Sequence, residues 1–479
     1  MNSRAQREQT QIDGPVHFLG AGGAGVSGAL RVAAAAGLEV SGTDQTSTRF
    51  TELLEAEGYD IRLCDDTLPE RTKTLVRSVA VPIGHPACVA ARERGVEVLK
   101  YAEFLGRLCP AGRTLAVSGT HGKTTGSWML YHALRGIARE FAEPAPGALV
   151  GGVSCEAETN AIAPEPDADF VVEACEYDRS FLQLRPFGAI ISNLEEDHLD
   201  YYGDLGAIEN AFARFVDGVE KDGLLVVGPK VSEVALSSAP CEVWRLGKEL
   251  KVDLLDEESG YFRFRVRGPK WATPEISLRV PGEFNVENAA LAIALAVGVS
   301  ARRGRQEASA LAVAAAKGLM EFSGVERRFQ RWGEEAEVRV FHDYAHHPTE
   351  VKVTLETARS VIQGGELHVL FQPHQHSRTA RFLEDFVKSL SLADRVVVAD
   401  VYGARLHIDT ESAGSEELVT RLKRAQVEAV FGGDLAGSVS AAMERVPTGG
   451  GLLVLGAGDV DGIRDELLNS LALRCALVR

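Results

Sequence analysis

Short apolar runs and helix-like stretches alternate from the start of the chain. Residues 16–19 (Val-His-Phe-Leu) have strand character, residues 29–36 form a helix of small residues, and residues 38–41 have strand character again. Alternation of this kind predicts a parallel sheet. The pattern breaks at residues 109–112 (Cys-Pro-Ala-Gly), so we expect the first domain to end at residue 110.

The pattern resumes with a buried strand at residues 114–117, followed by a helical stretch. Further on, the apolar runs at 169–173 and 188–193 each end in polar residues. Such endings are typical of the carboxyl edge of a parallel sheet, where ligands bind. Residues 260–280 then alternate like strands, and an Ala/Leu-rich helix runs from Ala289.

The last part of the chain alternates once more. Its candidate strands are residues 338–341, 367–371, 395–399, 429–432 and 452–455. We find neither a sequence repeat nor a low-complexity linker. The pattern therefore predicts an α/β fold with mostly parallel sheets. The expected segments are a flexible tail at 1–14 and three domains at 15–110, 111–322 and 323–479.

Composition narrows the class of protein. The chain has 479 residues, 45% hydrophobic and 25% charged, as soluble globular proteins have. Its net charge of −17 argues against nucleic-acid binding. We see no apolar run that would span a bilayer and no secretory signal at the N-terminus. The seven cysteines include no C-x-x-C pair, which fits a reducing compartment such as the cytoplasm.

The most informative stretch is Ser-Gly-Thr-His-Gly-Lys-Thr-Thr at 118–125. A strand, a glycine loop with Gly-Lys-Thr and a helix are the setting of a nucleotide phosphate loop. Backbone N–H groups hold the phosphates there, the lysine meets the β- and γ-phosphates, and the threonine hydroxyl takes Mg²⁺. The spacing departs from G-x-x-x-x-G-K-[ST], because Val117 stands where the first glycine would be. The candidate residues are Gly119, Thr120, His121, Gly122, Lys123, Thr124 and Thr125.

A second glycine loop follows the first strand and satisfies G-x-G-x-x-G. An acid ends the second strand, where a ribose-binding carboxylate would sit. In this context the loop indicates a bound diphosphate, and taken alone it suggests an NAD-dependent oxidoreductase. The candidate residues are Gly20, Ala21, Gly22, Gly23, Ala24, Gly25 and Asp44.

Polar residues near the phosphate loop provide candidate Mg²⁺ partners. Glu173 closes one strand, and Asn-Leu-Glu-Glu-Asp-His at 193–198 follows another. Mg²⁺ prefers oxygen ligands and keeps several waters, so His198 would be an unusual direct ligand and could act through water.

Two further strand ends, in the third part, carry polar groups. Residues 343–348 read Asp-Tyr-Ala-His-His-Pro, and neighbouring residues in a strand point in opposite directions. We therefore expect one or two of these histidines to hydrogen-bond a substrate or nucleotide. In the stretch 371–381, Arg378 could bind a carboxylate or phosphate, because its guanidinium group can donate to two oxygens at once.

With these pieces in order, the chain resembles the Mur ligase family of peptidoglycan synthesis over residues 15–460. The resemblance rests on the motifs at 17–28, 41–44, 119–125, 173–182, 193–198, 322–330, 343–350 and 371–374. It implies a Rossmann-like N-terminal domain for a UDP-sugar, a central ATPase domain and a C-terminal Rossmann-like domain. It also assigns the glycine loop at residues 20–25 to the UDP diphosphate rather than to NAD.

The family reaction, in the branch that this chain resembles most, uses ATP with Mg²⁺. ATP phosphorylates the lactyl carboxylate of UDP-N-acetylmuramate, and the amine of L-alanine then attacks the acyl phosphate. Lys123 and Mg²⁺ would neutralise the repulsion between carboxylate and triphosphate. We expect the site to be complete only when the domains close, which keeps water from the acyl phosphate.

The resemblance also implies roles for single residues. Thr124 and Glu173 would hold Mg²⁺, and His198 a second Mg²⁺. Asn288 would meet adenine, Arg328 the phosphates and Asp343 the nucleotide. The amino-acid side would involve Tyr344, His347 and Arg378. The catalytic set would be Lys123, Glu173, His198 and Arg328.

Three departures from the family pattern stand out. Cys175 replaces a more common aspartate, so thiol reagents are expected to inhibit. Gln375 and His376 stand where Arg-Tyr is common in the family. The amino-acid substrate is therefore left open between L-alanine, glycine and L-serine. The stretch that starts at Ser78 only loosely resembles the family's sugar loop.

Other functions stay open at this point. A recycling ligase that joins UDP-N-acetylmuramate to a tripeptide shares the same loops, and an oxidoreductase would leave Lys123 unexplained. A sensor that only binds a UDP-sugar would not need Lys123, Thr124, Glu173 and His198. We expect a monomer or homodimer that acts on small molecules, with neither nucleic acid nor membrane as a partner.

Overall fold

The computed structural model describes residues 12–196, 199–304, 306–403, 414–447 and 449–478. Its internal contacts divide the chain into two compact units. The first unit holds residues up to Leu254 with Phe264–Ile276 and Val286–Ser323, and the second holds Leu255–Arg263, Ser277–Asn285 and everything from Gly324. Each unit has its own hydrophobic core.

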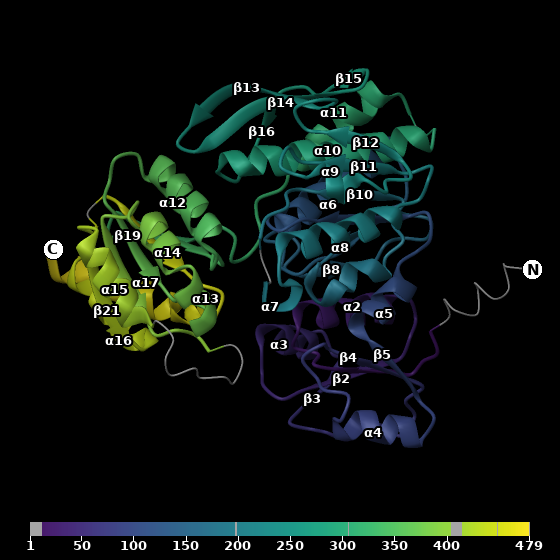
Figure 1. Cartoon of the computed structure of the whole chain (residues 1–479), viewed down its shortest axis with the longest axis horizontal. Coiled ribbons are helices and arrows are strands. Elements are labelled where there is room, and N and C mark those ends of the chain that lie inside the picture. The colour runs from purple at the N-terminus through teal and green to yellow at the C-terminus, as the bar shows by residue number, and fades with distance from the viewer. Residues whose placement is uncertain (1–11, 197–198, 305, 404–413, 448, 479) are drawn as a thin grey trace, which may run out of the picture. The chain divides into compact units, whose positions relative to one another are not determined.

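The first unit begins with a parallel sheet in the order β3-β2-β1-β4-β5 (Figure 1). Its strands are β1 Val16–Leu19, β2 Val40–Asp44, β3 Asp60–Leu63, β4 Thr74–Arg77 and β5 Glu97–Lys100. Its helices are α2 Ala24–Ala35, α3 Arg49–Ala56, α4 Pro86–Glu93 and α5 Tyr101–Leu108. The strand order reverses between β1 and β4. In open α/β sheets, ligands bind at the carboxyl ends of the strands beside such a switch point.

The same unit continues with a larger sheet in the order β12-β11-β10-β6-β9-β7-β8, parallel except for the β7–β8 pair. Its strands are β6 Thr114–Ser118, β7 Gly147–Leu149, β8 Ala161–Ile162, β9 Phe170–Glu173, β10 Gly188–Ile191, β11 Leu224–Val227 and β12 Glu242–Arg245. Its helices are α6 Lys123–Phe141, η1 Tyr177–Gln183, α7 Leu199–Tyr202, α8 Leu205–Asp217, α9 Glu233–Leu236, α10 Glu283–Arg302 and α11 Ala308–Leu319. Because β6 lies between β9 and β10, the loops after these three strands meet at one edge.

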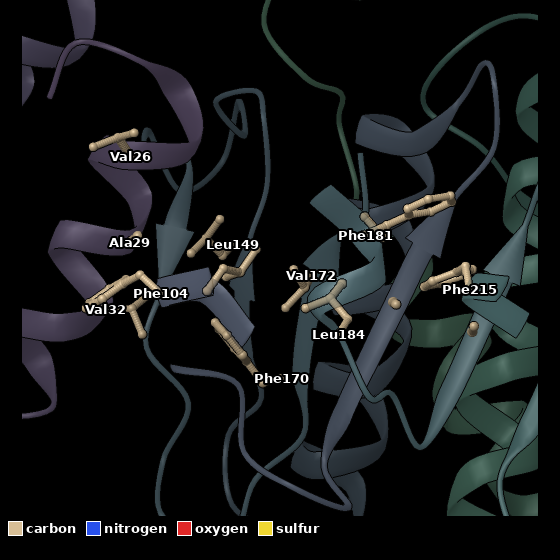
Figure 2. Close-up of a cluster of buried hydrophobic side chains, with 14 of the residues drawn as sticks. Val26, Ala29, Val32, Phe104, Leu149, Phe170, Val172, Phe181, Leu184 and Phe215 are labelled. Carbon is tan, nitrogen blue, oxygen red and sulfur yellow. The ribbon is translucent and has the colours of Figure 1, made fainter. Parts of the chain in front are cut away.

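One hydrophobic core joins the two sheets of the first unit (Figure 2). Val26, Ala29 and Val32 of α2 and Phe104 of α5 belong to the same buried cluster as residues of the larger sheet. That cluster continues through Leu149, Phe170, Val172, Phe181, Leu184 and Phe215. Figure 2 shows Ala29, Val32 and Phe104 on the side of Leu149 and Phe170. The two sheets are therefore held together by burial of shared apolar surface.

Residues 251–277 add short strands in the order β13-β14-β15, with β16 paired to β14. They are β13 Lys251–Glu258, β14 Tyr261–Gly268, β15 Trp271–Ala272 and β16 Ile276–Ser277.

The second unit carries a sheet in the order β17-β18-β22-β19-β20-β21, parallel except for the β17–β18 pair. Its strands are β17 Gln330–Glu335, β18 Val338–Asp343, β19 Leu367–Phe371, β20 Arg395–Ala399, β21 Glu428–Gly433 and β22 Gly451–Leu455. Its helices are α12 Pro348–Ile362, α13 His376–Arg381, α14 Leu383–Leu390, α15 Ser415–Arg424, α16 Leu435–Glu444, η2 Val460–Ile463 and α17 Arg464–Val478. The α/β class and the parallel sheets predicted from the sequence are confirmed.

Several boundaries differ from the sequence prediction, including those of β2, α2 and α10. The second strand starts at Val40 rather than at residue 38, because Gly37, with a φ of +89°, and Leu38 turn back onto the end of α2. Helix α2 starts at Ala24, directly after the glycine loop, and α10 starts at Glu283 rather than at Ala289.

Helix α10 also corrects the prediction that no apolar run could span a bilayer. It has 20 residues with a mean hydropathy of 1.5 over its most apolar window, enough by length and composition to cross a membrane. However, 83% of that window is buried inside the protein. The helix is therefore apolar because it lies in a core.

Candidate active site

The phosphate loop has the predicted order of strand β6, glycine loop and helix α6. Gly119 and Gly122 adopt φ angles of +134° and +83°, which side chains rarely allow. A Cβ atom at Gly119 would collide with Ser192, and one at Gly122 would lie 2.7 Å from Asn288 Oδ1. The backbone therefore needs glycine at both positions. The tight turn aims the N-terminus of α6 at the sheet edge, as anion binding requires.

Lys123 folds back over this loop. Its Nζ donates to the carbonyls of Gly119 (2.7 Å) and Thr120 (3.0 Å) and to Glu176 Oε1 (2.9 Å). Burial opposes the charged amine, but the Glu176 carboxylate more than offsets it, and the pKa of Lys123 is raised. The lysine is therefore a fixed, fully charged cation at the mouth of the loop.

Residues from the next strand brace the loop from one side. Asn193, after β10, accepts from the His121 N–H (2.8 Å) and donates to the His121 carbonyl (3.0 Å). Glu195 lies 3.7 Å from His121 Nε2, and the interaction with this imidazole is the largest cause that lowers the pKa of Glu195 to about 2. Sequence reasoning assigned the motif 193–198 to metal binding and missed this bracing role.

Glu173 ends β9 and lies opposite Val117 of β6 in the sheet register. Its Oε2 accepts from the Gly151 N–H at 2.7 Å. Thr124 is buried in the first turn of α6, and Asn288 of α10 lies against Gly122. The structure thus brings Glu173, Thr124 and Asn288 to the phosphate loop, while His198 lies outside the described residues.

The proposed metal site has oxygen donors of the right kind. Within the described ranges, no group of three or more His, Cys, Asp or Glu side chains is arranged to hold a metal ion. The carboxylate of Glu173 and the hydroxyl of Thr124 nevertheless suit Mg²⁺, which completes its shell with water and substrate phosphates. These residues fit the ion, with a nucleotide supplying further oxygens.

The diphosphate loop lies at the switch point of the first sheet. The Asp44 carboxylate accepts from the Gly22 N–H at 2.8 Å, so it holds the loop itself. A Cβ atom at Gly20 would lie 2.7 Å from Cβ of Ser78, and one at Gly25 would lie 2.7 Å from the Tyr101 ring. Ser78, after β4, is therefore placed beside the loop after β1.

In the second unit, Asp343 ends β18 and is buried. It accepts from the N–H groups of Phe329 (2.6 Å) and Ala345 (2.7 Å). Burial raises the pKa of Asp343 to about 6, although the charge of Arg328 acts against the shift. Arg328 and Arg327 both lie over the Tyr344 ring, 5.1 and 4.8 Å from its centroid. The structure thus brings Arg328, Asp343 and Tyr344 together.

His347 and Arg378 occupy different positions in this unit. His347 is buried and caps α12, with Nδ1 accepting from the Thr349 N–H at 3.4 Å. The adjacent histidines lie in the turn before α12 rather than in a strand, so the alternation argument does not apply to them. Arg378 of α13 donates to His374 Nδ1 at 3.3 Å, and the His374 ring lies 5.5 Å from that of His346.

Two of the departures from the family pattern, one in each unit, can be described from the structure. Gln375 precedes α13 with a φ of +68°, and His376 begins that helix. Cys175 is accessible to solvent, but the protein atoms crowded around it raise the pKa of its thiol to about 12. The raised pKa disfavours the reactive thiolate, so rapid modification at neutral pH is not expected.

Two glycine-rich loops at the ends of strands in parallel α/β sheets, one with a largely buried lysine, are typical of enzymes that bind nucleotides and other phosphorylated ligands. Comparisons with known proteins narrow this class. Family models match residues 15–113 (Mur ligase family, catalytic domain), 117–296 (Mur ligase middle domain) and 327–458 (Mur ligase, glutamate ligase domain).

The relatives agree with these models. A UDP-N-acetylmuramate–L-alanine ligase from Kineococcus radiotolerans is 39% identical over 96% of this chain and 97% of its own. The crystal structure of the UDP-N-acetylmuramate-alanine ligase MurC from Thermotoga maritima matches with a TM-score of 0.78 and 26% identity over 97% and 99% of the two chains. A murein peptide ligase from Psychrobacter arcticus shares the fold, with a TM-score of 0.69 and 23% identity over 95% and 98%. The chain belongs to the Mur ligase family, and its fold is the three-domain α/β fold of that family.

Proposed function

We propose that this protein joins L-alanine to the lactyl carboxylate of UDP-N-acetylmuramate, with hydrolysis of ATP, in peptidoglycan precursor synthesis. Relatives of that name at 33–40% identity support the substrates. The single structural observation that carries the chemistry is the charged, largely buried Lys123 on a loop whose backbone conformation requires glycine at positions 119 and 122. The reaction belongs in the cytoplasm, where these precursors are made.

The residues support two chemical steps. Lys123 and the backbone N–H groups of the loop bind the triphosphate and stabilise the charge that spreads over the transferred phosphoryl group. When bound at Thr124 and Glu173, Mg²⁺ would neutralise further phosphate charge. The resulting acyl phosphate would then react with the amine of L-alanine, releasing phosphate and leaving an amide.

The remaining roles are part of the same proposal. Asn288 would contact the adenine of the nucleotide, Arg328 would contact its phosphates, and Asp343 would also contact the nucleotide. The loop at 20–25 with Asp44 and Ser78 would hold the UDP diphosphate. The amino-acid side would be formed by Tyr344, His347 and Arg378, and His198 would hold a second Mg²⁺. We place the domain boundaries after residues 110 and 322.

The test is phosphate release from ATP and Mg²⁺ with UDP-N-acetylmuramate, measured with and without L-alanine. We expect release that depends on L-alanine, and a loss of about a hundredfold or more in kcat/KM for Lys123→Ala. Lys317→Ala is the matched control. Lys317 of α11 forms an exposed ion pair with Glu140, which lies at the end of α6 opposite Lys123. Ligation retained by a folded Lys123→Ala protein would contradict the role of the lysine.

The recycling reaction with a tripeptide is the second candidate, because the murein peptide ligase of Psychrobacter arcticus shares the fold. Parallel assays with L-alanine, glycine, L-serine and the tripeptide separate the two. Turnover with the tripeptide and none with L-alanine would replace our assignment. Membership of a ligase family leaves the NAD-dependent oxidoreductase without support.

A further inference from the structure

One short segment of the first unit, Glu176–Arg179, contacts the phosphate loop, the first sheet and α7, and it has no role in the reaction described above. It begins three residues after Glu173, which ends β9, and it includes the start of η1. We refer to residues 176–179 as the linking segment. Its two carboxylates, Glu176 and Asp178, each pair with a lysine from a different binding loop or domain.

The first contact is with the phosphate loop. Glu176 Oε1 lies 2.9 Å from Lys123 Nζ, and the two side chains are only 5% and 14% exposed. An ion pair shielded from water is strong when both partners stay in place. A phosphate that approaches Lys123 must therefore compete with Glu176 for the amine. The position of Glu176 thus affects how strongly Lys123 binds the phosphates of a nucleotide.

The second contact is with the sheet that carries the diphosphate loop. Lys100, the last residue of β5, lies 3.2 Å from Asp178. The next residue, Tyr101, has its ring against Gly25 of the diphosphate loop. Tyr101 is also close enough to Glu173 for the charge of that carboxylate to act on its phenol. Residues 100 and 101 thus touch the diphosphate loop on one side and the linking segment on the other.

The third contact is with α7, which begins directly after His198. The Tyr202 hydroxyl donates to the Glu176 carbonyl at 2.5 Å, and the Arg179 guanidinium lies 5.9 Å from the ring centres of both Tyr201 and Tyr202. The linking segment is therefore held by α7 as well.

The backbone of the linking segment is strained. Asp178 and Arg179 are consecutive non-glycine residues with φ angles of +52° and +54°. Such a conformation persists only when the surrounding contacts fix it. Loss or movement of one contact would let these two residues relax into the ordinary helical region and shift Glu176.

We propose that the linking segment couples the two binding sites, so that occupancy of the diphosphate loop changes the hold of Glu176 on Lys123 and hence the affinity for the nucleotide. The ligands named here rest on the proposed function. Asp178 and Lys100 are positioning residues in this scheme, because they act on the nucleotide only through Glu176 and Lys123. Thermodynamic linkage requires the effect to be reciprocal.

The test is calorimetric binding of AMP-PNP with Mg²⁺, with and without saturating UDP-N-acetylmuramate, and the reverse titration. In the wild-type protein we expect each ligand to change the Kd of the other by the same factor, about fivefold or more. Asp178→Asn and Lys100→Met should each bring this factor close to one. The double variant should resemble either single variant, because both remove the same ion pair. Asp178→Glu, which keeps the charge, should restore part of the factor.

Glu140→Gln is the matched control, since it breaks an exposed lysine–carboxylate pair of the same unit at 3.0 Å. It should leave the factor unchanged. A wild-type factor of one, or variants that keep the wild-type factor, would overturn the coupling. Phosphate release that depends on L-alanine, measured on the wild-type protein, tests the proposed function separately, so failure of one can be told from failure of the other.

Discussion

His17 shows how burial controls ionisation at a single residue. It lies in β1 with 1% of its surface exposed, and its Nδ1 is 2.8 Å from Ser41 Oγ. Burial is the main cause that lowers the pKa of His17 to about 4, with a smaller contribution from the charge of Arg62. The folded protein therefore keeps this imidazole neutral at pH values where an unfolded chain would protonate it.

We predict that His17 makes the stability of the first unit fall below neutral pH. Between pH 6.5 and 4 the imidazole is protonated in the unfolded chain and neutral in the folded one. The contribution of His17 to the free energy of unfolding is therefore fully present above this window and is lost as the pH falls through it. Between pH 7.5 and 4.5 the wild-type protein should lose roughly 2 to 3 kcal/mol more than His17→Gln. Urea unfolding of both proteins at the two pH values measures this, and equal losses would show that His17 does not contribute.

Single residues of the site were predictable where the signal is local. The glycines at 119 and 122 and Lys123 lie in one short stretch, and the Gly-Lys-Thr sequence between a strand and a helix indicates a phosphate loop although its spacing is unusual. The pairing of Lys123 with Glu176 and of His121 with Asn193 was not predictable in this way. These partners are 53 and 72 residues apart, and they meet only because β9 and β10 flank β6 in the sheet.

At the scale of elements, helices α6 and α11 cross with their backbones in contact. A Cβ atom at Gly136 of α6 would collide with Ala314 and lie 2.7 Å from Cα of Gly318. A Cβ atom at Gly318 of α11 would collide with the carbonyl of His132. Because backbone cannot move aside as a side chain can, both positions require glycine for the helices to pack.

We therefore predict that Gly318→Ala destabilises the first unit by about 2 to 3 kcal/mol, despite the higher helix propensity of alanine. Since α6 carries Lys123 at its N-terminus, the KM for ATP should rise as well. Gly84→Ala is the control, because a Cβ atom at Gly84 meets nothing within 4 Å. Thermal unfolding and ATP kinetics measure both effects, and an unchanged midpoint would show that the helices separate without cost.

Elements were predictable from the sequence where an apolar run has polar neighbours on both sides. The strands at 367–371 and 395–399 were predicted to the residue for this reason. The two-residue β8 and the polar β17 carry no such run and were missed. The start of α10 was placed too late, because its first turn is polar and lacks the Ala/Leu pattern of the rest.

At the scale of the whole molecule, the shared core predicts that the two sheets of the first unit unfold together. Phe104 of α5 is fully buried, 5.2 Å from the Phe18 ring in an edge-to-face arrangement, and belongs to the cluster that continues through the larger sheet. Three of the four tryptophans, Trp128, Trp244 and Trp271, lie in the part of this unit that follows the first sheet, and Trp332 lies in the second unit.

We predict that Phe104→Ala, made in a Trp332→Phe background, lowers the unfolding free energy reported by the remaining tryptophans by about 3 to 5 kcal/mol. The reason is that the cavity opens in a core on which both sheets depend, although Phe104 itself lies beside the first sheet. Val89→Ala is the control, because Val89 of α4 is 40% exposed, and it should shift neither the fluorescence nor the dichroism transition appreciably. Urea transitions followed by tryptophan fluorescence and by far-UV circular dichroism should move together. An early dichroism step that appears in the Phe104→Ala protein and not in its Trp332→Phe parent, with the tryptophan midpoint unchanged, would mean that the first sheet unfolds alone. The two sheets would then be separate folding units.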